Sequence, residues 1–432
     1  MRDELVRREE LEAEIAELEQ GAGWARRTAA AIVGSGAAAL LAKHRPKHGP
    51  DASEAERRGV EMRRKRFRLA RRKRVLEGGH GAPRGATMPE AASGEVGRAP
   101  SFLIRVAGRD WESARRGGDI RLALSLAAAL RGRGHRADIQ LTRADAPEGA
   151  EDRFDVILTV RGRHGGEPAS GSLNLLWLIS HPDEVDAAEL SRYDRVLVAS
   201  RRYARELAPT VDVPVEPLLQ FTDPRLFEPR PDTGPAYDVL FVGNWRGEFR
   251  RIVWDAIQIG HPPALYGRGW DLLAPEHAVA EHVPHSDLAQ LYSSCKVLLC
   301  DHWDDMRRHG FVSNRVFDAL ACETFVLCDA NPALEEVLPG AVDIYADQAD
   351  LREKLGRYLA DHEERARMAR RGREIVLARH TAERRAEELL EITATAAGDP
   401  GDSAQGLGGL GARANDGSAA AGTEPAADEA SR

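Results

Sequence analysis

The chain has few cysteines, and their placement excludes whole classes of protein. It has four, Cys295, Cys300, Cys322 and Cys328, none with the CxxC spacing of a metal or redox site. All four lie in or beside apolar stretches. We therefore expect buried free thiols in a reducing compartment, and neither a disulfide framework nor a cysteine-bound metal.

Long apolar runs are also missing. The weakly apolar stretch 29–42 is rich in Ala and Gly, and a membrane-spanning helix needs about 20 predominantly apolar residues. The first residues are densely charged, which predicts no signal peptide. These features predict a cytoplasmic protein, with peripheral association at the inner membrane face as an alternative.

Charge is uneven along the chain, although its net value is −8. The segment from Arg57 to Arg74 carries eleven Lys and Arg residues with apolar residues between them. Such a segment suits an anionic membrane surface or nucleic acid. Because no aromatic platform accompanies the charges, nucleic acid is not expected as a partner. A basic helix that solubilises the chain or pairs with its own acidic segments remains the competing interpretation.

The region 101–225 predicts a parallel sheet covered by helices on both faces, because apolar strands alternate with helical patterns. The expected strands are 101–107, 135–141, 154–160, 173–179 and 194–199, and the expected helices are 118–131 and 201–207.

A proline-rich connector follows, and the same rhythm then restarts. Strands are expected at 237–243, 263–267, 297–300, 324–328 and 342–345, and helices at 249–260, 286–294, 313–322, 348–359, 363–378 and 381–393. After residue 396, Gly, Ala, Ser and Asp dominate, which predicts disorder.

The expected fold class is therefore α/β, with two Rossmann-like doubly wound domains facing each other across a cleft. The predicted parts are a basic helical extension and linker (1–100), a first Rossmann-like domain (101–225), a second Rossmann-like domain (236–378), a C-terminal helix (379–395) and a tail (396–432). In such sheets ligands bind outside the carboxyl ends of the strands.

The most informative motif is a polar loop that runs into an amphipathic helix at residues 308–321. Ser313 and Asn314 are good N-cap residues, so the helix is expected to start there. Its first-turn amides and dipole form an anion site. Asp318 lies about one turn further on, so amides and carboxylate together suit a nucleoside diphosphate. An ordinary capped helix is the alternative.

Two further loops follow predicted strands of the second region and are expected to reach the same cleft. One contains Gly243, Asn244 and Arg246, and the other contains Gly267 and Arg268. An Arg fork matches phosphate oxygens.

Arg246 is the first candidate to bind phosphate, with Arg315 second. A solvent-facing loop charge is the alternative for Arg246. His302, Asp304 and Asp305 are not interpreted as a metal site.

In the first region, Gly118 belongs to a glycine turn expected to line the cleft, and His181 ends a predicted strand. His181 is a candidate to contact a ligand or to carry a proton. A His before Pro at a strand end is also a common capping arrangement, and both interpretations remain open.

From residue 102 to residue 392 the chain resembles the GT-B glycosyltransferases of the retaining, group-1 type, and within them the branch similar to the spore-maturation glycosyltransferases. The resemblance is carried by residues 241–245, 266–270, 288–293 and, above all, 310–321. It implies a retaining, metal-independent hexosyltransferase with no cofactor. The implied partners are a nucleotide-sugar donor, bound by the second domain (236–378), and a glycan, lipid or protein acceptor, bound by the first (101–225), as in cell-envelope or glycan biosynthesis. With such substrates, Arg246 and then Arg315 are the candidates to stabilise the leaving phosphate, and His181 is a candidate to contact the transferred sugar.

The resemblance places Asp318 where the family usually has a Glu that holds the nucleotide ribose. A second family Glu, which faces the donor sugar, falls at Gly310, after Arg308 and His309. With no acid there, His309 and the backbone around Gly310, Phe311 and Val312 are the expected sugar contacts. The departure also leaves open a catalytically impaired nucleotide-binding or scaffold protein.

Overall fold

The computed structural model describes residues 99–114, 117–142, 153–163, 165–230, 236–245 and 250–398. The predictions for the basic segment from Arg57 to Arg74, for Arg246 and for the tail from residue 399 onward lie outside these residues. By its contacts the chain divides into a unit Met1–Leu389 and a unit Leu390–Arg432. Both sheets belong to the first unit, which the following description concerns.

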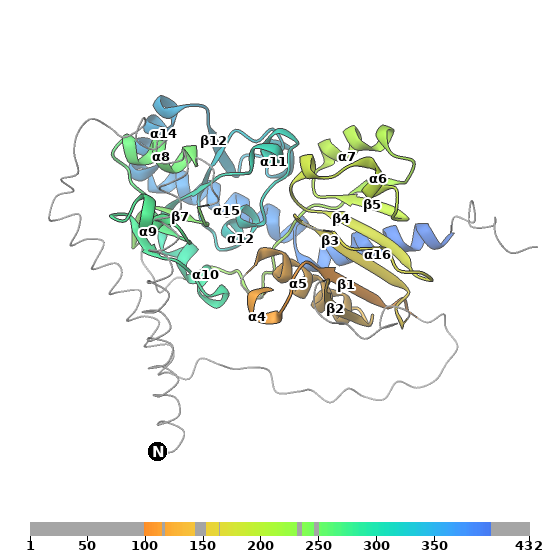
Figure 1. Cartoon of the computed structure of the whole chain (residues 1–432). Helices are drawn as coiled ribbons and strands as arrows, with labels where there is room; N and C mark the ends of the chain where they lie inside the picture. Colours follow the sequence, from red (N-terminus) through yellow and green to blue (C-terminus); the bar gives the residue numbers. More distant parts are fainter. Residues whose placement is uncertain are drawn as a thin grey trace, which may run out of the picture. The chain divides into compact units, whose positions relative to one another are not determined.

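The first sheet has six parallel strands in the order β2-β1-β3-β4-β5-β6 (Figure 1). Its strands are β1 (Phe102–Val106), β2 (Ala137–Leu141), β3 (Val156–Arg161), β4 (Leu173–Leu178), β5 (Arg195–Val198) and β6 (Val215–Pro217). Its helices are α4 (Trp111–Ala114), α5 (Gly118–Gly132), α6 (Ala187–Leu190) and α7 (Arg201–Leu207).

The second sheet also has six parallel strands, in the order β12-β11-β10-β7-β8-β9. Its strands are β7 (Tyr237–Val242), β8 (Ala264–Tyr266), β9 (Ala278–Ala280), β10 (Cys295–Cys300), β11 (Val326–Asp329) and β12 (Val342–Tyr345). Its helices are α8 (Arg251–Gln258), α9 (Trp270–Leu273), α10 (His285–Ser293), α11 (Asp304–Arg308), α12 (Asn314–Ala321), α13 (Leu334–Val337), α14 (Gln348–Ala360) and α15 (His362–Arg379). Helix α16 (Ala382–Gly398) begins in the same unit.

Each sheet has one point where successive strands are added in opposite directions. In the first sheet this switch point lies between β1 and β3, and in the second it lies between β7 and β10. Loops leaving the carboxyl ends of the two strands diverge there and open a crevice in which ligands bind. These two crevices are the places to look for a site.

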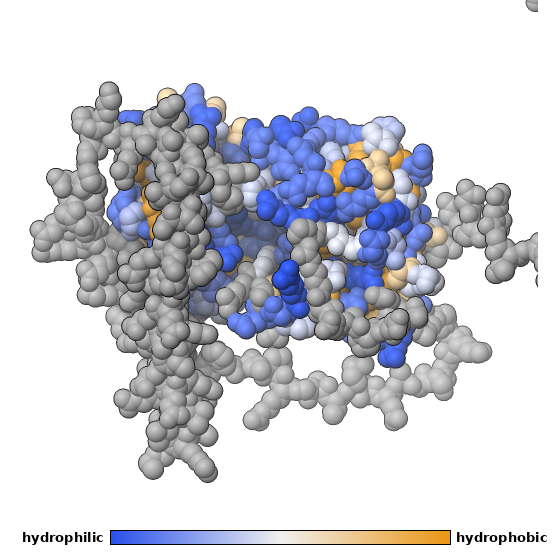
Figure 2. Space-filling model, viewed as in Figure 1, coloured by the Kyte–Doolittle hydropathy of each residue, from blue (hydrophilic) through white to orange (hydrophobic). Residues whose placement is uncertain are grey.

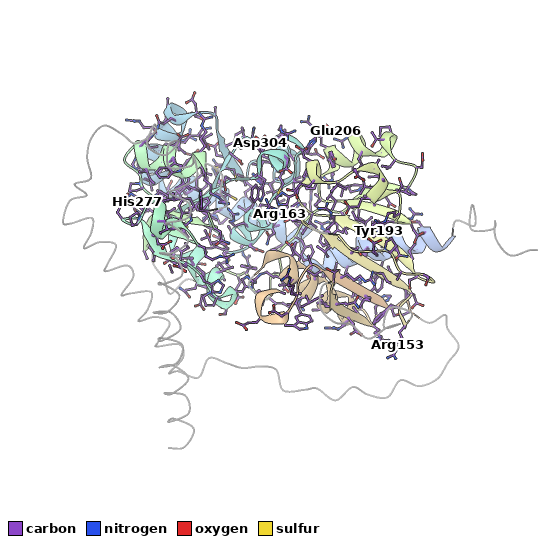
Figure 3. The ribbon with its side chains drawn as sticks, in the orientation of Figure 1. Arg153, Arg163, Tyr193, Glu206, His277 and Asp304 are labelled. Atoms are coloured by element: carbon purple, nitrogen blue, oxygen red, sulfur yellow. The ribbon has the colours of Figure 1, made fainter. Side chains whose placement is uncertain are left out.

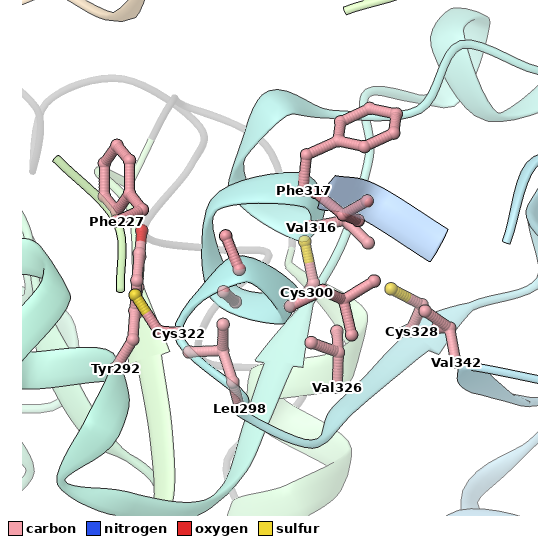
Figure 4. Packing of buried hydrophobic residues seen from close by; sticks show 14 of the residues in the cluster. Phe227, Tyr292, Leu298, Cys300, Val316, Phe317, Cys322, Val326, Cys328 and Val342 are labelled. Carbon is pink, nitrogen blue, oxygen red and sulfur yellow. The ribbon is translucent and has the colours of Figure 1, made fainter. Parts of the chain in front are cut away.

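The helix that carries the most informative motif is packed tightly into the core. Val316 and Phe317 of α12 pack with Cys300 of β10 and with Val326 and Cys328 of β11 (Figure 4). On its other side α15 approaches closely, because a Cβ atom at Gly372 would lie 2.5 Å from Leu320 Cδ2. The start of α12 is therefore held rigidly.

Large apolar side chains are nearly all inside, and the described surface seen in Figure 2 is mainly hydrophilic. The larger exposed apolar residues are Trp111, Leu124, Leu226, Leu272 and Ile344. All four cysteines are free, and three are buried, as the sequence predicted. In the described part of the chain no helix is long and apolar enough to cross a membrane.

The predicted α/β class and the two tandem parallel sheets are confirmed, and most predicted elements lie within a few residues of the observed ones. Seven elements were not predicted, namely the strands β6 and β9 and the helices α4, α6, α9, α11 and α13. Strands β6 and β9 have only three residues each, too few for a periodic pattern. Helix α11 is charged in sequence, DDMRR, and was expected to be a loop.

Candidate functional site

Helix α12 begins at Asn314 with Ser313 as its N-cap, as the sequence predicted. The Arg315 amide donates to Ser313 Oγ at 3.4 Å, and the Asn314 amide donates to Gln220 Oε1 at 2.7 Å. Gln220 also donates through Nε2 to the carbonyl of Ile179, after β4. Protein oxygens thus already satisfy two first-turn amides, so a phosphate bound to the Asn314 amide would displace Gln220.

Asp318 is buried, with 4% of its surface exposed. Its Oδ1 accepts a 2.7 Å hydrogen bond from Thr222 Oγ1, and Asn314 Nδ2 donates to Oδ2 at 3.4 Å. Burial raises the pKa of Asp318 to about 7, against the lowering effects of the Thr222 hydroxyl and the Arg121 charge. The carboxylate therefore joins α12 to the connector between the sheets, and its predicted role in ribose binding stays a prediction.

A cationic cluster lies at the switch point of the second sheet. Arg250, just before α8, pairs with Asp301 at 3.0 Å, and Arg315 Nη1 lies 3.8 Å from the same carboxylate. Both guanidinium groups lie over the Phe241 ring, at 4.8 and 5.7 Å from its centroid. Two cations thus lie close to one carboxylate, and Arg250 also lies beside Gly243.

Arg250 was not predicted as a site residue. The available signal was a basic residue immediately before the first helix after β7, where a parallel sheet opens its crevice. The sequence interpretation gave that role to Arg246, which follows the glycine turn more closely and lies outside the described residues.

The loop after β7, which contains Gly243, contacts the loop after β8, which contains Gly267, as the sequence predicted. The Arg268 amide donates to Asn244 Oδ1 at 2.9 Å, and Trp270 Nε1 donates to the carbonyl of Gly243 at 2.7 Å. Gly267 has a φ of 138°, and a Cβ atom there would collide with the Gly243 carbonyl. The glycines therefore allow two loops to pack against each other, while the side chains of Asn244 and Arg268 remain exposed.

The segment 303–311 crosses from the second sheet to the first. Ser200 Oγ donates to the His309 carbonyl at 2.6 Å, and the His309 ring lies 3.2 Å from Asp183 and 3.3 Å from Glu206. Met306 and Phe311 are buried in a cluster formed otherwise by the first sheet and its helices. Figure 3 labels Asp304 of α11 and Glu206 of α7, the two helices beside this contact.

Gly310 sits inside this contact, and its surroundings explain the missing acid. Its φ is 73°, and a Cβ atom there would lie 3.2 Å from Ala333 Cβ and 3.4 Å from Ser200 Oγ. A Glu at this position would be strained by the positive φ and would crowd Ala333 and Ser200. The side chains of Phe311 and Val312 are also buried, and the Phe311 amide donates to the Met306 carbonyl at 2.8 Å. Of the backbone contacts expected for the donor sugar, the Phe311 amide is thus occupied.

His181 adopts a left-handed conformation, with a φ of 54°, which costs energy for a residue other than glycine and is common at functional sites. The side chain makes no capping hydrogen bond. Its ring packs edge-on against Trp303, and Nδ1 lies 3.9 Å from Asp305 Oδ2. Burial lowers the pKa of His181, so the imidazole is mainly neutral near pH 7 and able to accept a proton.

The starts of α5 and α12 face each other. A Cβ atom at Gly118 would lie 3.9 Å from Asn314 Oδ1. The switch point of the first sheet is thereby brought next to the predicted nucleotide site. Within the described residues no group of three or more His, Cys, Asp or Glu side chains is arranged to hold a metal ion.

Comparison with known proteins agrees with this architecture. Residues 248–391 match the model of the family described as glycosyl transferase-like, and no curated protein matches the chain in sequence. Sucrose-phosphate synthase from Thermosynechococcus elongatus superposes with a TM-score of 0.51 at 15% identity, covering 69% of this chain and 99% of that one. HepE from Anabaena, solved in complex with UDP-glucose, gives 0.52 at 12% identity, covering 68% and 99%. The chain therefore has the GT-B glycosyltransferase fold, and its second half carries the sequence pattern of a glycosyl transferase-like family.

Proposed function

We propose that the protein is a glycosyltransferase that moves a hexose from a nucleotide-sugar donor to an acceptor hydroxyl. The observation that carries the proposal is the pair of cations, Arg250 and Arg315, at the switch point between β7 and β10. When the sugar departs, negative charge builds on the diphosphate. Fixed guanidinium groups in a largely buried place stabilise that charge without reorganising.

The donor contacts are proposed from the same geometry. Arg315, on the first turn of α12, has part of its side chain exposed and contacts the diphosphate, with Arg250 behind it. Asp318 takes the ribose hydroxyls once the Thr222 hydroxyl is displaced, and Arg246 is a further phosphate contact proposed from the sequence. UDP is the first nucleotide to test, because HepE, which shares the fold, was solved with UDP-glucose.

The remaining features follow from the resemblance to group-1 enzymes. It implies metal-independent transfer, retention of the anomeric configuration and a place in the spore-maturation-like branch. Arginines at the diphosphate supply the charge that a metal would otherwise supply, which supports metal independence. The acceptor is proposed to be a glycan, lipid or protein, and the place of action to be the cytoplasm.

A nucleotide-binding scaffold without activity is the second candidate. It is favoured by Gly310, where the acid that usually faces the donor sugar would be strained and crowded. The two candidates share nucleotide binding and differ in turnover, so release of UDP from UDP-glucose distinguishes them.

The test is a thermal-shift series with UDP, GDP, ADP, CDP and dTDP, since a ligand that binds only the folded state raises the melting temperature. Arg315→Gln should weaken binding of the preferred diphosphate by about 1–3 kcal/mol, the scale of a lost charged hydrogen bond. Binding of the corresponding nucleoside, which has no phosphate, should be unchanged. The control is Arg352→Gln, an exposed cation on α14.

The proposal fails if none of the five nucleotides raises the melting temperature. Equal losses of diphosphate and nucleoside binding in Arg315→Gln would remove this residue from the phosphate site.

A further inference from the structure

Asp119 lies at the switch point of the first sheet, and none of the assignments above uses it. It belongs to the first turn of α5, the helix that follows β1. Its Oδ2 atom lies close to Gly162, which directly follows β3. A Cβ atom at Gly162 would lie 2.6 Å from Asp119 Oδ2 and 3.7 Å from Ser180 Oγ. The carboxylate thus sits where the loops after β1, β3 and β4 meet.

This carboxylate is half-buried. Among the described residues no side chain or amide makes a hydrogen bond or ion pair with it, and burial raises its pKa above the ordinary value of 3.8. Titratable groups with perturbed pKa values cluster at catalytic sites.

The loops that surround Asp119 are held together by hydrogen bonds. Arg161, with 4% of its surface exposed, donates to the carbonyl of Gly162 at 2.6 Å and to the carbonyl of Glu184 at 2.8 Å. Its Nε and Nη2 atoms donate to the Glu189 carboxylate at 2.8 and 3.1 Å. One buried guanidinium therefore fixes the loops after β3 and β4 together, as preorganised catalytic groups require.

Asp119 also faces the proposed donor site. Its neighbour Gly118 approaches Asn314, the first residue of α12, as described above. The acid stands on the first sheet, and the cations Arg250 and Arg315 stand on the second. In the arrangement proposed next, the leaving phosphate of a bound sugar lies at these cations and Asp119 lies on the opposite side of the sugar.

We propose that Asp119 is the general base that accepts the proton of the acceptor hydroxyl, and that the transfer inverts the anomeric centre. The proposal rests on the glycosyltransferase function proposed above. The acceptor O–H bond breaks and its proton goes to the Asp119 carboxylate. The acceptor oxygen bonds to the anomeric carbon as the bond from that carbon to the phosphate oxygen breaks, and the electron pair leaves with the diphosphate.

Inversion follows from the placement of the base. A carboxylate that activates the attacking oxygen on the face opposite the leaving group is the arrangement of single displacement. The inference departs from the retention that the resemblance implies. It agrees with Gly310, whose positive φ and close neighbours disfavour the acid that the group-1 enzymes place at the sugar.

The first test is the product anomer. The full-length protein is incubated with UDP-glucose, or with the α-linked hexose conjugate of another nucleotide if that nucleotide stabilises more strongly. Methanol is present as a small acceptor, because a methyl glycoside does not interconvert between anomers. Proton NMR should show the β-glycoside. An α-glycoside would overturn the inference while leaving the glycosyltransferase function intact.

The second test uses matched variants. Asp119→Asn should lower kcat roughly 10²–10⁴-fold, the scale of lost general-base catalysis, with nucleotide affinity unchanged. Asp138→Asn, on an exposed acid of β2, should behave as the wild type. Gly162→Ala should also lower kcat, because its Cβ displaces the carboxylate, whereas Gly132→Ala meets no atom within 4 Å and should be neutral.

The pH profile separates catalysis from structural support. The wild-type rate should fall as the pH falls through the raised pKa of Asp119, because only the carboxylate accepts a proton. His181→Gln should keep this acidic limb, since His181 is a separate group. Full activity in a folded Asp119→Asn protein, or loss of nucleotide binding together with activity, would overturn the assignment. Absence of nucleotide binding in the wild type would instead overturn the proposed function.

Discussion

Replacing Asp318 by Asn should stabilise the protein and weaken its nucleotide binding at the same time. Burial raises the pKa of Asp318 from 3.8 to about 7, so the folded state prefers the protonated acid. Between these two values the folded state binds more protons than the unfolded state, and stability from this group falls as the pH rises. The full loss of folding free energy from the buried Asp318 carboxylate is present above pH 7, where Asp318 is ionised in both the folded and the unfolded state.

The magnitude follows from the shift. About three pKa units at 1.36 kcal/mol each give an upper limit of about 4 kcal/mol, and relaxation of the buried site reduces the expected gain at pH 8 to about 1–2 kcal/mol. Asn keeps the shape and still accepts the hydrogen bond from Thr222 Oγ1. The melting temperature at pH 8 should therefore rise by a few degrees, whereas below pH 4 the two proteins should be nearly equal.

The measurement is thermal or urea unfolding from pH 4 to pH 8, with Asp212→Asn as the control because Asp212 is exposed. Isothermal titration with the preferred diphosphate should show a loss of about 1–3 kcal/mol in binding free energy for Asp318→Asn. A variant less stable than the wild type at pH 8 would refute the reasoning about burial. Unchanged nucleotide affinity in a folded variant would remove Asp318 from the site.

Two further predictions concern Gly310 and the N-terminal extension. Gly310→Ala should cost about 2–4 kcal/mol, combining the positive φ with overpacking against Ala333. The control Gly340→Ala, with a similar φ of 67° but no neighbour within 4 Å, should cost only about 1–2 kcal/mol; equal losses in urea unfolding would show that the contact is not tight. The segment from Arg57 to Arg74 should retain the full-length protein on anionic vesicles at low salt and release it at high salt, since each basic residue near the surface contributes about 1 kcal/mol. A version starting at Ala99 should stay in the supernatant, and sedimentation of both versions alike would contradict the prediction.

Local signals made much of the fold predictable. Apolar strands alternating with helices defined both sheets, and Ser313 marked the start of α12 because an N-cap depends only on neighbours in sequence. Helix α11 was missed because its stability comes from elsewhere. Its single apolar side chain, Met306, is buried against the first sheet, a contact that no local pattern contains.

The site was less predictable for the same reason. Asp318 was identified from its place in the motif, but its partner Thr222 lies 96 residues away in the sequence, so its burial and raised pKa were not foreseeable. Asp119 directly follows Gly118 of the predicted glycine turn and was not predicted as a site residue. Its significance depends on Gly162, which folding brings beneath its carboxylate.

The crossing of residues 303–311 has a consequence for recombining proteins of this fold. Met306 and Phe311 belong by sequence to the half with the second sheet but fill the core of the half with the first sheet. A chimera joined at the proline-rich connector would combine these two side chains from one parent with the surrounding core of the other parent. Exchanges of the first half should therefore carry residues 303–311 along with it, although that segment lies far downstream of the apparent boundary.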